Sequence, residues 1–231
     1  ATNKKYKDLE GAGFTLYKLT GTHQEDDPTR ALTFVGNNPL DLRMDRREGI
    51  GAQEWLRSVS ADDLAMALRK NADMDRAYKL SARMVEMAAK TGEENRDILP
   101  SDVKEIVESV FPDKKRDTNS LLARVFQAIR MEVNGELRQI EESLQGAVKC
   151  LKKGGRLVVV SYHSVEDRCV KETVAAFEKD CICPENLPVC MCGGNHRKLV
   201  KVNRKPILPS ADEVNKNSRA RSAKLRVYQR V

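Results

Sequence analysis

Four cysteines lie close together near the C-terminal end of this 231-residue sequence. They are Cys181, Cys183, Cys190 and Cys192, in the pattern Cys-x-Cys-x6-Cys-x-Cys. Four thiolates so close in sequence can reach one tetrahedral ion, and Zn²⁺ is the ion that such a ligand set favours. Each cysteine pair encloses one residue, whereas the cysteine pairs of zinc sites usually enclose two to four. The pattern is therefore compatible with zinc, with plain reduced thiols and, outside a reducing compartment, with disulfides.

A second group suited to chemistry is the polar segment 161–164, Ser-Tyr-His-Ser. It follows the β-branched run 156–162, whose composition is that of a buried parallel strand. In α/β proteins reactive groups gather where the carboxyl end of a strand meets the next loop, so Ser161 and His163 are candidate catalytic residues. The alternative for His163 is a helix-entry residue that bonds to the local backbone.

Helical patterns precede this strand in the sequence. Residues 51–111 contain three of them with no strand between: one that Ser60 and Asp63 cap, one over 76–90, and one that starts at Pro100. Farther along, apolar residues spaced by three and four run from Phe126 to Leu151, which predicts one helix of roughly seven turns.

Two further elements complete the predicted fold. The run 14–19 has β-prone residues between glycines and is predicted to be a strand. After the strand at 156–162, Ser164 and Asp167 are predicted to cap a helix. Helix, glycine turn, buried strand and capped helix in this order are typical of α/β architecture.

The excess positive charge is confined to the C-terminal end. Residues 197–231 contain 11 Lys and Arg and only two acids, while the whole chain has a net charge of +7. A basic tail on a nearly neutral body favours binding to a polyanion such as nucleic acid, although a tail that merely improves solubility would look the same. No run of apolar residues is long enough to cross a membrane, so no membrane partner is expected.

Within this tail, residues 217–226 alternate basic and small side chains. An extended segment would place Arg219 and Arg221 on one face, where arginines can hold phosphates with two hydrogen bonds each. Lys224 and Arg226 extend the basic series. The alternative is a final strand whose arginines face solvent or pair with acids such as Glu132 and Glu136.

Five motifs resemble those of the MraW/RsmH family of S-adenosylmethionine-dependent small-subunit rRNA (cytosine-N4) methyltransferases. They occur in the family's order and are PLDLRMD at 39–45, QEWL at 53–56, FQAIRMEVNGEL at 126–137, SYHSVEDR at 161–168 and NSRARSAKLR at 217–226. The resemblance implies an α/β fold: a partial Rossmann-like methyltransferase sheet with an all-helical insertion domain. The sheet domain would comprise residues 1–50 and 112–231, and the insertion residues 51–111.

The resemblance also implies roles for individual residues. His163, Ser161 and Asp41 would be catalytic, and Gln24 would contact the cofactor. Arg43, Arg219, Arg221, Lys224 and Arg226 would bind RNA. The family's glycine-rich cofactor loop has no counterpart in this sequence, and Lys18 stands where the family has Asp. We therefore expect this chain alone to bind S-adenosylmethionine weakly or not at all.

Three functions follow as competing hypotheses. The first is an rRNA (cytosine-N4) methyltransferase that acts on small-subunit rRNA near the decoding centre. The second is a catalytically inactive relative that binds rRNA as a ribosome-assembly or ribosomal component. A zinc-dependent nucleic-acid module built on the four cysteines is a third. The expected partner is small-subunit rRNA or the ribosomal subunit, and the expected location is the cytoplasm, or alternatively a mitochondrion or plastid.

Overall fold

The computed structural model describes residues 38–184, 187 and 189–231 and divides them into two compact units. We call residues 38–136 the helical unit and residues 137–231 the sheet unit. The predicted strand at 14–19, Lys18 and the cofactor candidate Gln24 lie outside the described residues. None of the helices in the described ranges is both long and apolar enough to cross a bilayer.

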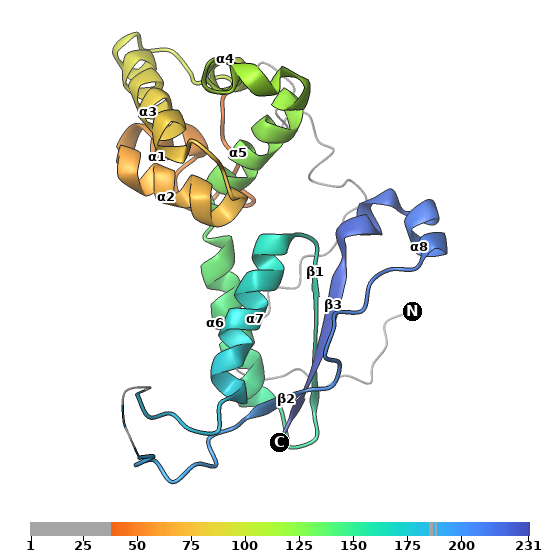
Figure 1. Cartoon of the computed structure of the whole chain (residues 1–231). Helices are drawn as coiled ribbons and strands as arrows, with labels where there is room; N and C mark the ends of the chain where they lie inside the picture. The colour runs from red at the N-terminus through yellow and green to blue at the C-terminus, as the bar shows by residue number, and fades with distance from the viewer. Residues whose placement is uncertain (1–37, 185–186, 188) are drawn as a thin grey trace. The chain divides into compact units, whose positions relative to one another are not determined.

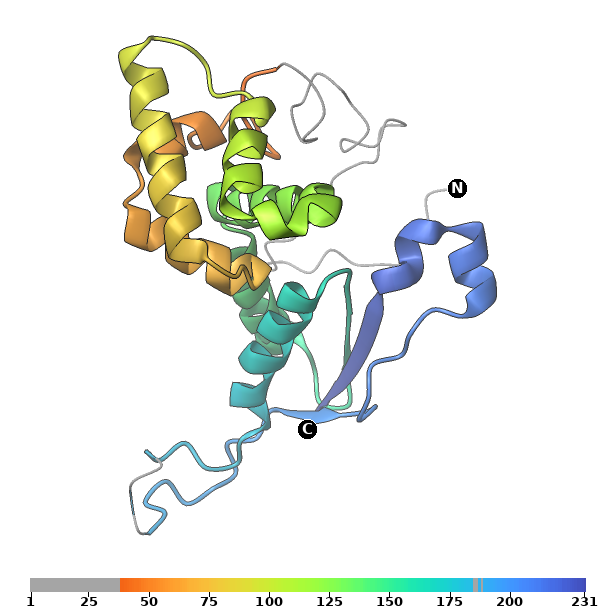
Figure 2. The same cartoon turned by 45° about the horizontal axis from the view of Figure 1, so that its top comes forward.

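The helical unit consists of helices around one apolar core (Figure 2). Its elements are α1 (Ala52–Ser58), α2 (Ala61–Ala72), α3 (Ala77–Glu93), α4 (Pro100–Val110), the 3₁₀ helix η3 (Pro112–Asp117) and α5 (Thr118–Val133). The predicted cap is confirmed, since the Ser60 side chain accepts a hydrogen bond from the backbone N–H of Asp63 at 3.1 Å. The predicted start of α4 at Pro100 is confirmed too. Helix α5 lies outside the range predicted for the insertion, yet its residues share this core.

The predicted seven-turn helix is wrong. Helix α5 ends at Val133, and α6 (Glu136–Cys150) begins after a turn in which Gly135 has φ +60°. A left-handed residue interrupts a helix, and glycine adopts that conformation without steric cost. The apolar stripe continues across the break because it serves two cores: Phe126 and Ile129 lie in the core of the helical unit, whereas Leu144 and Val148 lie in that of the sheet unit.

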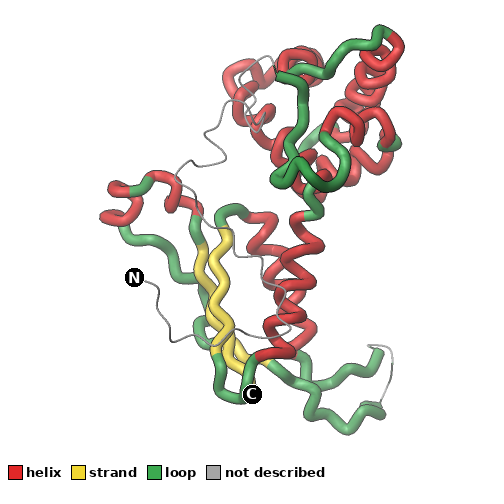
Figure 3. The backbone as a smooth tube through the Cα atoms, turned by 180° about the vertical axis from the view of Figure 1, so that it is seen from behind, coloured by secondary structure: helices red, strands yellow, loops and turns green. Residues whose placement is uncertain are grey.

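The sheet unit has three strands in its described part, in the order β1–β3–β2 (Figure 3). They are β1 (Arg156–Ser161), β2 (Leu199–Lys201) and β3 (Lys224–Arg230), and β3 pairs antiparallel with both neighbours. Helices α6 and α7 (Ser164–Glu178) contribute the apolar side chains that cover one face of the sheet (Figure 1). That core contains Leu144, Val148, Val170, Val174, Leu199 and Tyr228.

The predicted strand at 156–162 is confirmed in position, while its described pairing is antiparallel and one of its faces is exposed. Strand β1 pairs antiparallel with β3, with Leu157 opposite Tyr228, and the described residues give it no parallel partner. Leu157 and Val159 face the core, but Val158 and Val160 are 54% and 47% exposed. The described structure is therefore a mixed α/β fold with an antiparallel sheet.

The segment between β2 and β3 also differs from its prediction. Residues 217–226 do not form one extended segment: α8 (Ala211–Lys216) is followed by the 3₁₀ helix η4 (Ser218–Ser222), and β3 begins only at Lys224. The side chain of Asn217 accepts a hydrogen bond from the backbone N–H of Arg219 at 3.2 Å, which starts the 3₁₀ turn. Asn is a favoured residue at such a position.

Candidate functional sites in the two units

The loop that precedes α1 holds Asp41 at the centre of an arginine cluster. Arg43 donates from Nε to Asp41 Oδ1 at 2.6 Å, and Arg46 Nε lies 3.1 Å from Asp41 Oδ2. Burial raises the pKa of Asp41, but the hydrogen bonds and charge of Arg43 and the charge of Arg46 outweigh burial and lower it. Asp41 is therefore ionised at neutral pH and acts as an acceptor.

This loop is shaped by its backbone contacts. The carbonyls of Leu40 and Asp41 accept from the first N–H groups of α1, those of Gln53 and Ala52, at 2.9 and 2.6 Å. They take the place of a side-chain cap, which Gly51 cannot supply. A side chain at Gly51 would place its first carbon 3.2 Å from Asp41 Oδ1, so glycine allows the loop to approach α1 closely.

Asn134, the residue that follows the last turn of α5, connects the same loop to that helix. Its side-chain amide donates to Leu42 O at 2.9 Å, and its side-chain oxygen accepts from Met44 N at 2.7 Å. Leu42 is buried and has φ +59°, which is strained for a residue with a branched side chain. The two hydrogen bonds therefore stabilise the backbone of the strained loop that carries Asp41 and Arg43.

A polar pocket of about 290 Å³ opens beside this loop. Its lining residues are Asn38, Pro39, Leu40, Asp41, Arg43, Arg46, Gln53 and Glu54. Arg43, a predicted RNA ligand, also donates to the carbonyls of Arg46 and Gly49 at 3.1 and 3.2 Å. Its guanidinium thus organises the loop from within.

In the sheet unit, the turn from β1 to α7 contains Ser161 and His163. The predicted cap is wrong here: His163, not Ser164, is the N-cap residue, and Glu166, not Asp167, completes the capping box. His163 Nδ1 accepts from the backbone N–H of Glu166 at 3.3 Å. This is the helix-entry role that the sequence left open as the alternative to catalysis.

The Glu166 carboxylate completes the turn. It accepts from the backbone N–H groups of Tyr162 and His163 at 2.8 and 3.4 Å. Burial raises the pKa of Glu166, but its contacts with His163 and with these N–H groups outweigh burial and lower it. Glu166 therefore acts as an ionised acceptor that holds the turn in shape.

The second ring nitrogen of His163 lies inside this turn. His163 Nε2 is buried and lies 3.1 Å from Glu166 Oε1. Because Nδ1 acts as an acceptor, the matching tautomer carries its proton on Nε2. That donor thus faces the Glu166 carboxylate at the carboxyl end of β1, next to the buried Ser161.

The C-terminal cations separate into two groups. Arg219 and Arg221 are exposed, and both line an open groove of about 600 Å³ whose other lining residues are Val214, Asn215 and Ser218. Ala220, between them, is buried and anchors the 3₁₀ turn, so its two neighbours point outward. The 3₁₀ helix thus brings the two arginines to one groove without the extended backbone that the sequence predicted.

Arg226 and Lys224 instead lie against α7. Arg226 donates to both oxygens of Asp167 at 2.6 and 3.1 Å, and Lys224 Nζ lies 3.7 Å from Asp167 Oδ2. The Arg226 and Asp167 side chains are only 11% and 6% exposed. Arg226 thus pairs with an acid, as in the alternative that the sequence left open for the arginines of this segment, and that acid is Asp167.

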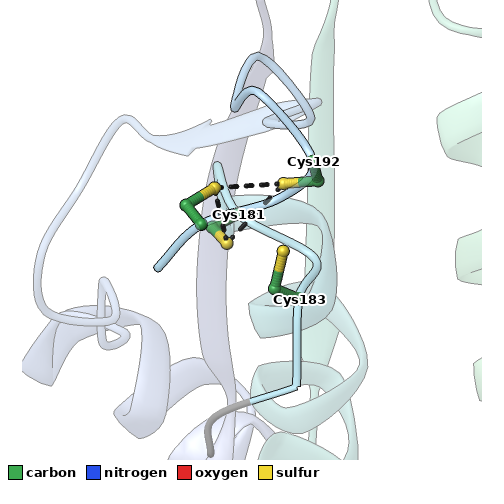
Figure 4. A group of neighbouring side chains, drawn as sticks. Cys181, Cys183 and Cys192 are labelled. Atoms are coloured by element: carbon green, nitrogen blue, oxygen red, sulfur yellow. Dashed lines mark hydrogen bonds between the residues drawn. The ribbon is translucent and has the colours of Figure 1, made fainter. Parts of the chain in front are cut away.

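The four clustered cysteines are brought together on the segment between α7 and β2 (Figure 4). Backbone N–H groups of Ile182 and Gly194 hydrogen-bond to the Cys192 sulfur and lower the pKa of this thiol to about 5. The backbone at Cys183 lowers the pKa of Cys181, but its contacts with the neighbouring thiols raise it to about 12. The Cys192 thiol is thus more acidic than the Cys181 thiol.

Sequence reasoning missed four residues that build these sites: Arg46, Asn134, Glu166 and Asp167. All four lie inside or beside the recognised motifs. A sequence signal was available for one of them: Glu166 lies three residues after His163, which is the spacing of a capping box. The pairings of Asn134 with residues 42–44 and of Asp167 with Arg226 span 90 or more and 59 positions, so no local pattern could reveal them.

Comparison with known proteins agrees with this arrangement of motifs. The profile of the MraW methylase family matches residues 15–231. Ribosomal RNA small subunit methyltransferase H of Caldicellulosiruptor saccharolyticus is 36% identical over 208 residues, covering 90% of this chain and 66% of the relative. The protein of the same name from Carboxydothermus hydrogenoformans is 38% identical over 208 residues, covering 90% of this chain and 65% of the relative.

A third relative of that name, from Clostridioides difficile, is 34% identical over 235 residues, covering 97% of this chain and 73% of the relative. This chain therefore spans about two thirds of the length of the first two relatives. The family profile covers nearly all of the sequence and includes every motif that builds the sites above. The chain belongs to the MraW methylase family.

Proposed function

We propose that this chain is the rRNA-recognising part of a small-subunit rRNA (cytosine-N4) methyltransferase that acts near the decoding centre. The relatives are named small-subunit rRNA methyltransferases, which supports the reaction class and the kind of substrate. The cytosine amine and the decoding-centre position rest on the resemblance of the motifs. The observation that carries the RNA-binding role is the groove at η4 with its two exposed arginines.

That groove suits an RNA backbone. Arg219 and Arg221 flank a buried alanine, and both residues line the same open groove. A guanidinium binds a phosphate through two parallel hydrogen bonds, and phosphate contacts position RNA without reading its sequence. We therefore assign the backbone of small-subunit rRNA to this groove.

The β1–α7 turn suits the orientation of a target base. In this proposal the Nε2–H group of His163, which lies against Glu166 in the structure, turns to an acceptor on the cytosine ring, such as O2 or N3, when the base binds. Ser161, at the same turn, remains the candidate for contact with the exocyclic amine, since a hydroxyl oxygen accepts its hydrogens. His163 thus positions the base and does not act as a general base. Its Nε2 already carries a proton, and its Nδ1 accepts the hydrogen bond from the backbone N–H of Glu166.

The described residues do not themselves fit S-adenosylmethionine, the methyl donor that the resemblance implies. In open α/β sheets, ligands bind at the carboxyl ends of the strands, where backbone and side-chain groups of the following turn are available to them. At the β1–α7 turn the N–H groups of Tyr162, His163 and Glu166 are all engaged within the capping box. The chain alone is therefore expected to bind this cofactor weakly, and calorimetry that gave a micromolar dissociation constant, about −8 kcal/mol, would contradict this.

The poor fit to S-adenosylmethionine supports a second candidate function, that of an inactive relative. An inactive relative that binds rRNA as a ribosome-assembly or ribosomal component would need the arginine groove and no cofactor site. It shares the RNA surface with the first candidate and differs only in the absence of methyl transfer.

One experiment separates the two candidates. The purified chain is incubated with S-adenosylmethionine and small ribosomal subunits that lack the modification, and the rRNA is digested and analysed for N4-methylcytidine by mass spectrometry. Filter binding to the same rRNA is measured in parallel. The cofactor is supplied at millimolar concentration, so that weak binding does not suppress the reaction. Methylation then supports the enzyme, binding without methylation supports the inactive relative, and the absence of both contradicts the proposal.

A further inference from the structure

The loop that joins α7 to β2 is long and has no helix or strand in its described part. It also has no core: Ile182, Val189 and Met191 are 63%, 69% and 80% exposed, and Leu187 is exposed as well. Long loops without secondary structure are uncommon in compact proteins, and segments too small for a core depend on disulfides or metals. Something other than apolar burial must therefore hold this loop in one shape.

Hydrogen bonds close the base of the loop. Lys198 N donates to Phe177 O at 2.8 Å, and His196 N donates to Asp180 O at 3.1 Å. Arg197 Nε adds a bond to Glu178 O at 3.0 Å. These contacts join the two ends of the loop, and the described residues of its distal part, where Cys183 and Cys190 lie, have no backbone pairing between the two sides.

The sulfur atoms converge in that distal part (Figure 4). The Sγ atoms of Cys181, Cys190 and Cys192 form a triangle with sides of 3.5, 3.5 and 3.6 Å. All four Sγ atoms, with that of Cys183, lie within 4.8 Å of one another. A tetrahedron of sulfurs around Zn²⁺, with bonds of ~2.3 Å, has edges of roughly 3.8 Å, whereas a disulfide requires about 2.05 Å.

The backbone around the cysteines also suits bound thiolates. Met191 N donates to Cys183 Sγ at 3.3 Å. After Cys192 the chain turns through Gly193 and Gly194, with φ +74° and +73°, which residues with side chains rarely adopt. Hydrogen bonds from backbone N–H groups to ligand sulfurs are the outer-shell contacts that orient metal ligands.

We propose that Cys181, Cys183, Cys190 and Cys192 bind one structural Zn²⁺ that holds the α7–β2 loop in shape. Four thiolates fill the tetrahedral coordination of Zn²⁺ and leave no open position for a substrate, so the site is structural and not catalytic. Soft thiolate ligands select zinc over hard cations. Binding releases the thiol protons to water, and no oxidant or reductant is involved.

The first test measures the metal. The chain is purified under reducing conditions, supplied with Zn²⁺, dialysed and analysed for zinc and iron by inductively coupled plasma mass spectrometry. We expect about one equivalent of zinc in the wild type and a loss of at least tenfold in the Cys190→Ser/Cys192→Ser variant. Cys150→Ser is the matched control, since Cys150 is also exposed but lies outside the cluster, and it should retain the metal.

The second test follows the loop itself. Trypsin cleavage at Lys179 and Arg197 should be slow with zinc and at least tenfold faster after removal of zinc by a chelator, while the helical circular dichroism stays unchanged. Substitution by Co²⁺ should give sulfur-to-cobalt charge-transfer absorption and the d–d bands of a tetrahedral site. Less than a tenth of an equivalent of zinc in the wild type, an equivalent of iron in its place, disulfides in the intact mass, or zinc retained by the double variant would overturn the proposal.

Discussion

Asp167 on α7 and Arg226 on β3 form a two-point ion pair, with Oδ1–Nε and Oδ2–Nη2 distances of 2.6 and 3.1 Å. Each residue belongs to one of the recognised motifs, and the contact joins the helix to the central strand of the sheet. Because both side chains are nearly buried, neither charge is well solvated if its partner is removed. The pair is therefore part of the packing of the sheet unit.

Replacement of Arg226 by Ala should destabilise the protein. It leaves the Asp167 carboxylate buried, with Lys224 and Lys171 at 3.7 and 4.0 Å as the remaining partners. We expect the free energy of unfolding, measured by urea denaturation, to fall by about 3 kcal/mol. Arg204→Ala removes an exposed cation and should change stability by less than about 0.5 kcal/mol. Equal effects of the two variants would refute the structural role of Arg226.

The same pair predicts a pH dependence of stability. Arg226 lowers the pKa of Asp167 below its ordinary value, and this effect exceeds the opposing effect of burial. A carboxyl whose pKa is lowered on folding contributes stability that is complete above the ordinary value of about 3.9 and is lost as pH falls through the lowered one. The free energy of unfolding should therefore fall more steeply below about pH 4 in the wild type than in Arg226→Ala. Parallel curves for the two proteins would exclude this contribution.

Arg219 and Arg221 should determine part of the salt dependence of RNA binding. If each neutralises one phosphate, Arg219→Ala/Arg221→Ala should reduce the slope of log affinity against log salt by roughly 1.4 to 1.8, at ~0.7 to 0.9 per contact. Affinity should fall similarly for RNAs of different sequence. The matched control is Lys152→Ala/Lys153→Ala, which removes two exposed cations from another turn. A lowered melting temperature with an unchanged salt slope would instead assign the arginines to the fold.

Asn134 should be needed for the loop that carries Asp41. Asn134→Ala removes two hydrogen bonds from the strained segment at Leu42 and Met44. Each such bond contributes about 1 kcal/mol, so the free energy of unfolding should fall by about 2 kcal/mol. Asn134→Asp keeps the acceptor for Met44 and loses the donor for Leu42, so its effect should lie between wild type and Asn134→Ala. An Asn134→Ala protein as stable as the wild type would show that the hydrogen bonds of Asn134 to Leu42 and Met44 do not stabilise the loop.

Two substitutions of His163 separate its capping role from its role toward a base. Asn is a favoured N-cap residue and Ala is not, so His163→Ala should cost about 1 kcal/mol of stability and His163→Asn much less. Both variants lose the buried Nε2 donor, so both should reduce cytidine methylation in the subunit assay. Activity retained by His163→Asn and lost by His163→Ala would show that the cap, and not the imidazole donor, matters.

Local patterns determined the elements that local interactions stabilise. The helix face of α4, with Val103, Ile106, Val107 and Val110, is buried as its spacing predicts. The Ser60 cap and the position of β1 were also predictable, because a cap or a β-branched run depends on neighbours within a few residues. The convergence of the four cysteines belongs to the same class, since all of them lie on one loop.

Local patterns were insufficient where one signal has two structural solutions. Apolar residues at helical spacing do not distinguish one long helix from two helices that pack in different cores. The turn at Asn134-Gly135 divides this segment into two helices. A β-branched run does not specify the direction of its partner, which β3 decided to be antiparallel. Ser164 and His163 both precede an acidic residue by three positions, and the backbone angles of His163 decided which of them caps α7.

The sequence by itself determined the family, the helical and basic character of the chain's parts, and the groups suited to chemistry. Only the tertiary structure decided what those groups touch. It placed Arg226 on Asp167 and Asn134 on the Leu42 loop, while Arg219 and Arg221 line an open groove. The reason is that a charged or polar side chain has many partners of equal chemistry along the chain. Its actual partner depends on distances between segments that are far apart in sequence.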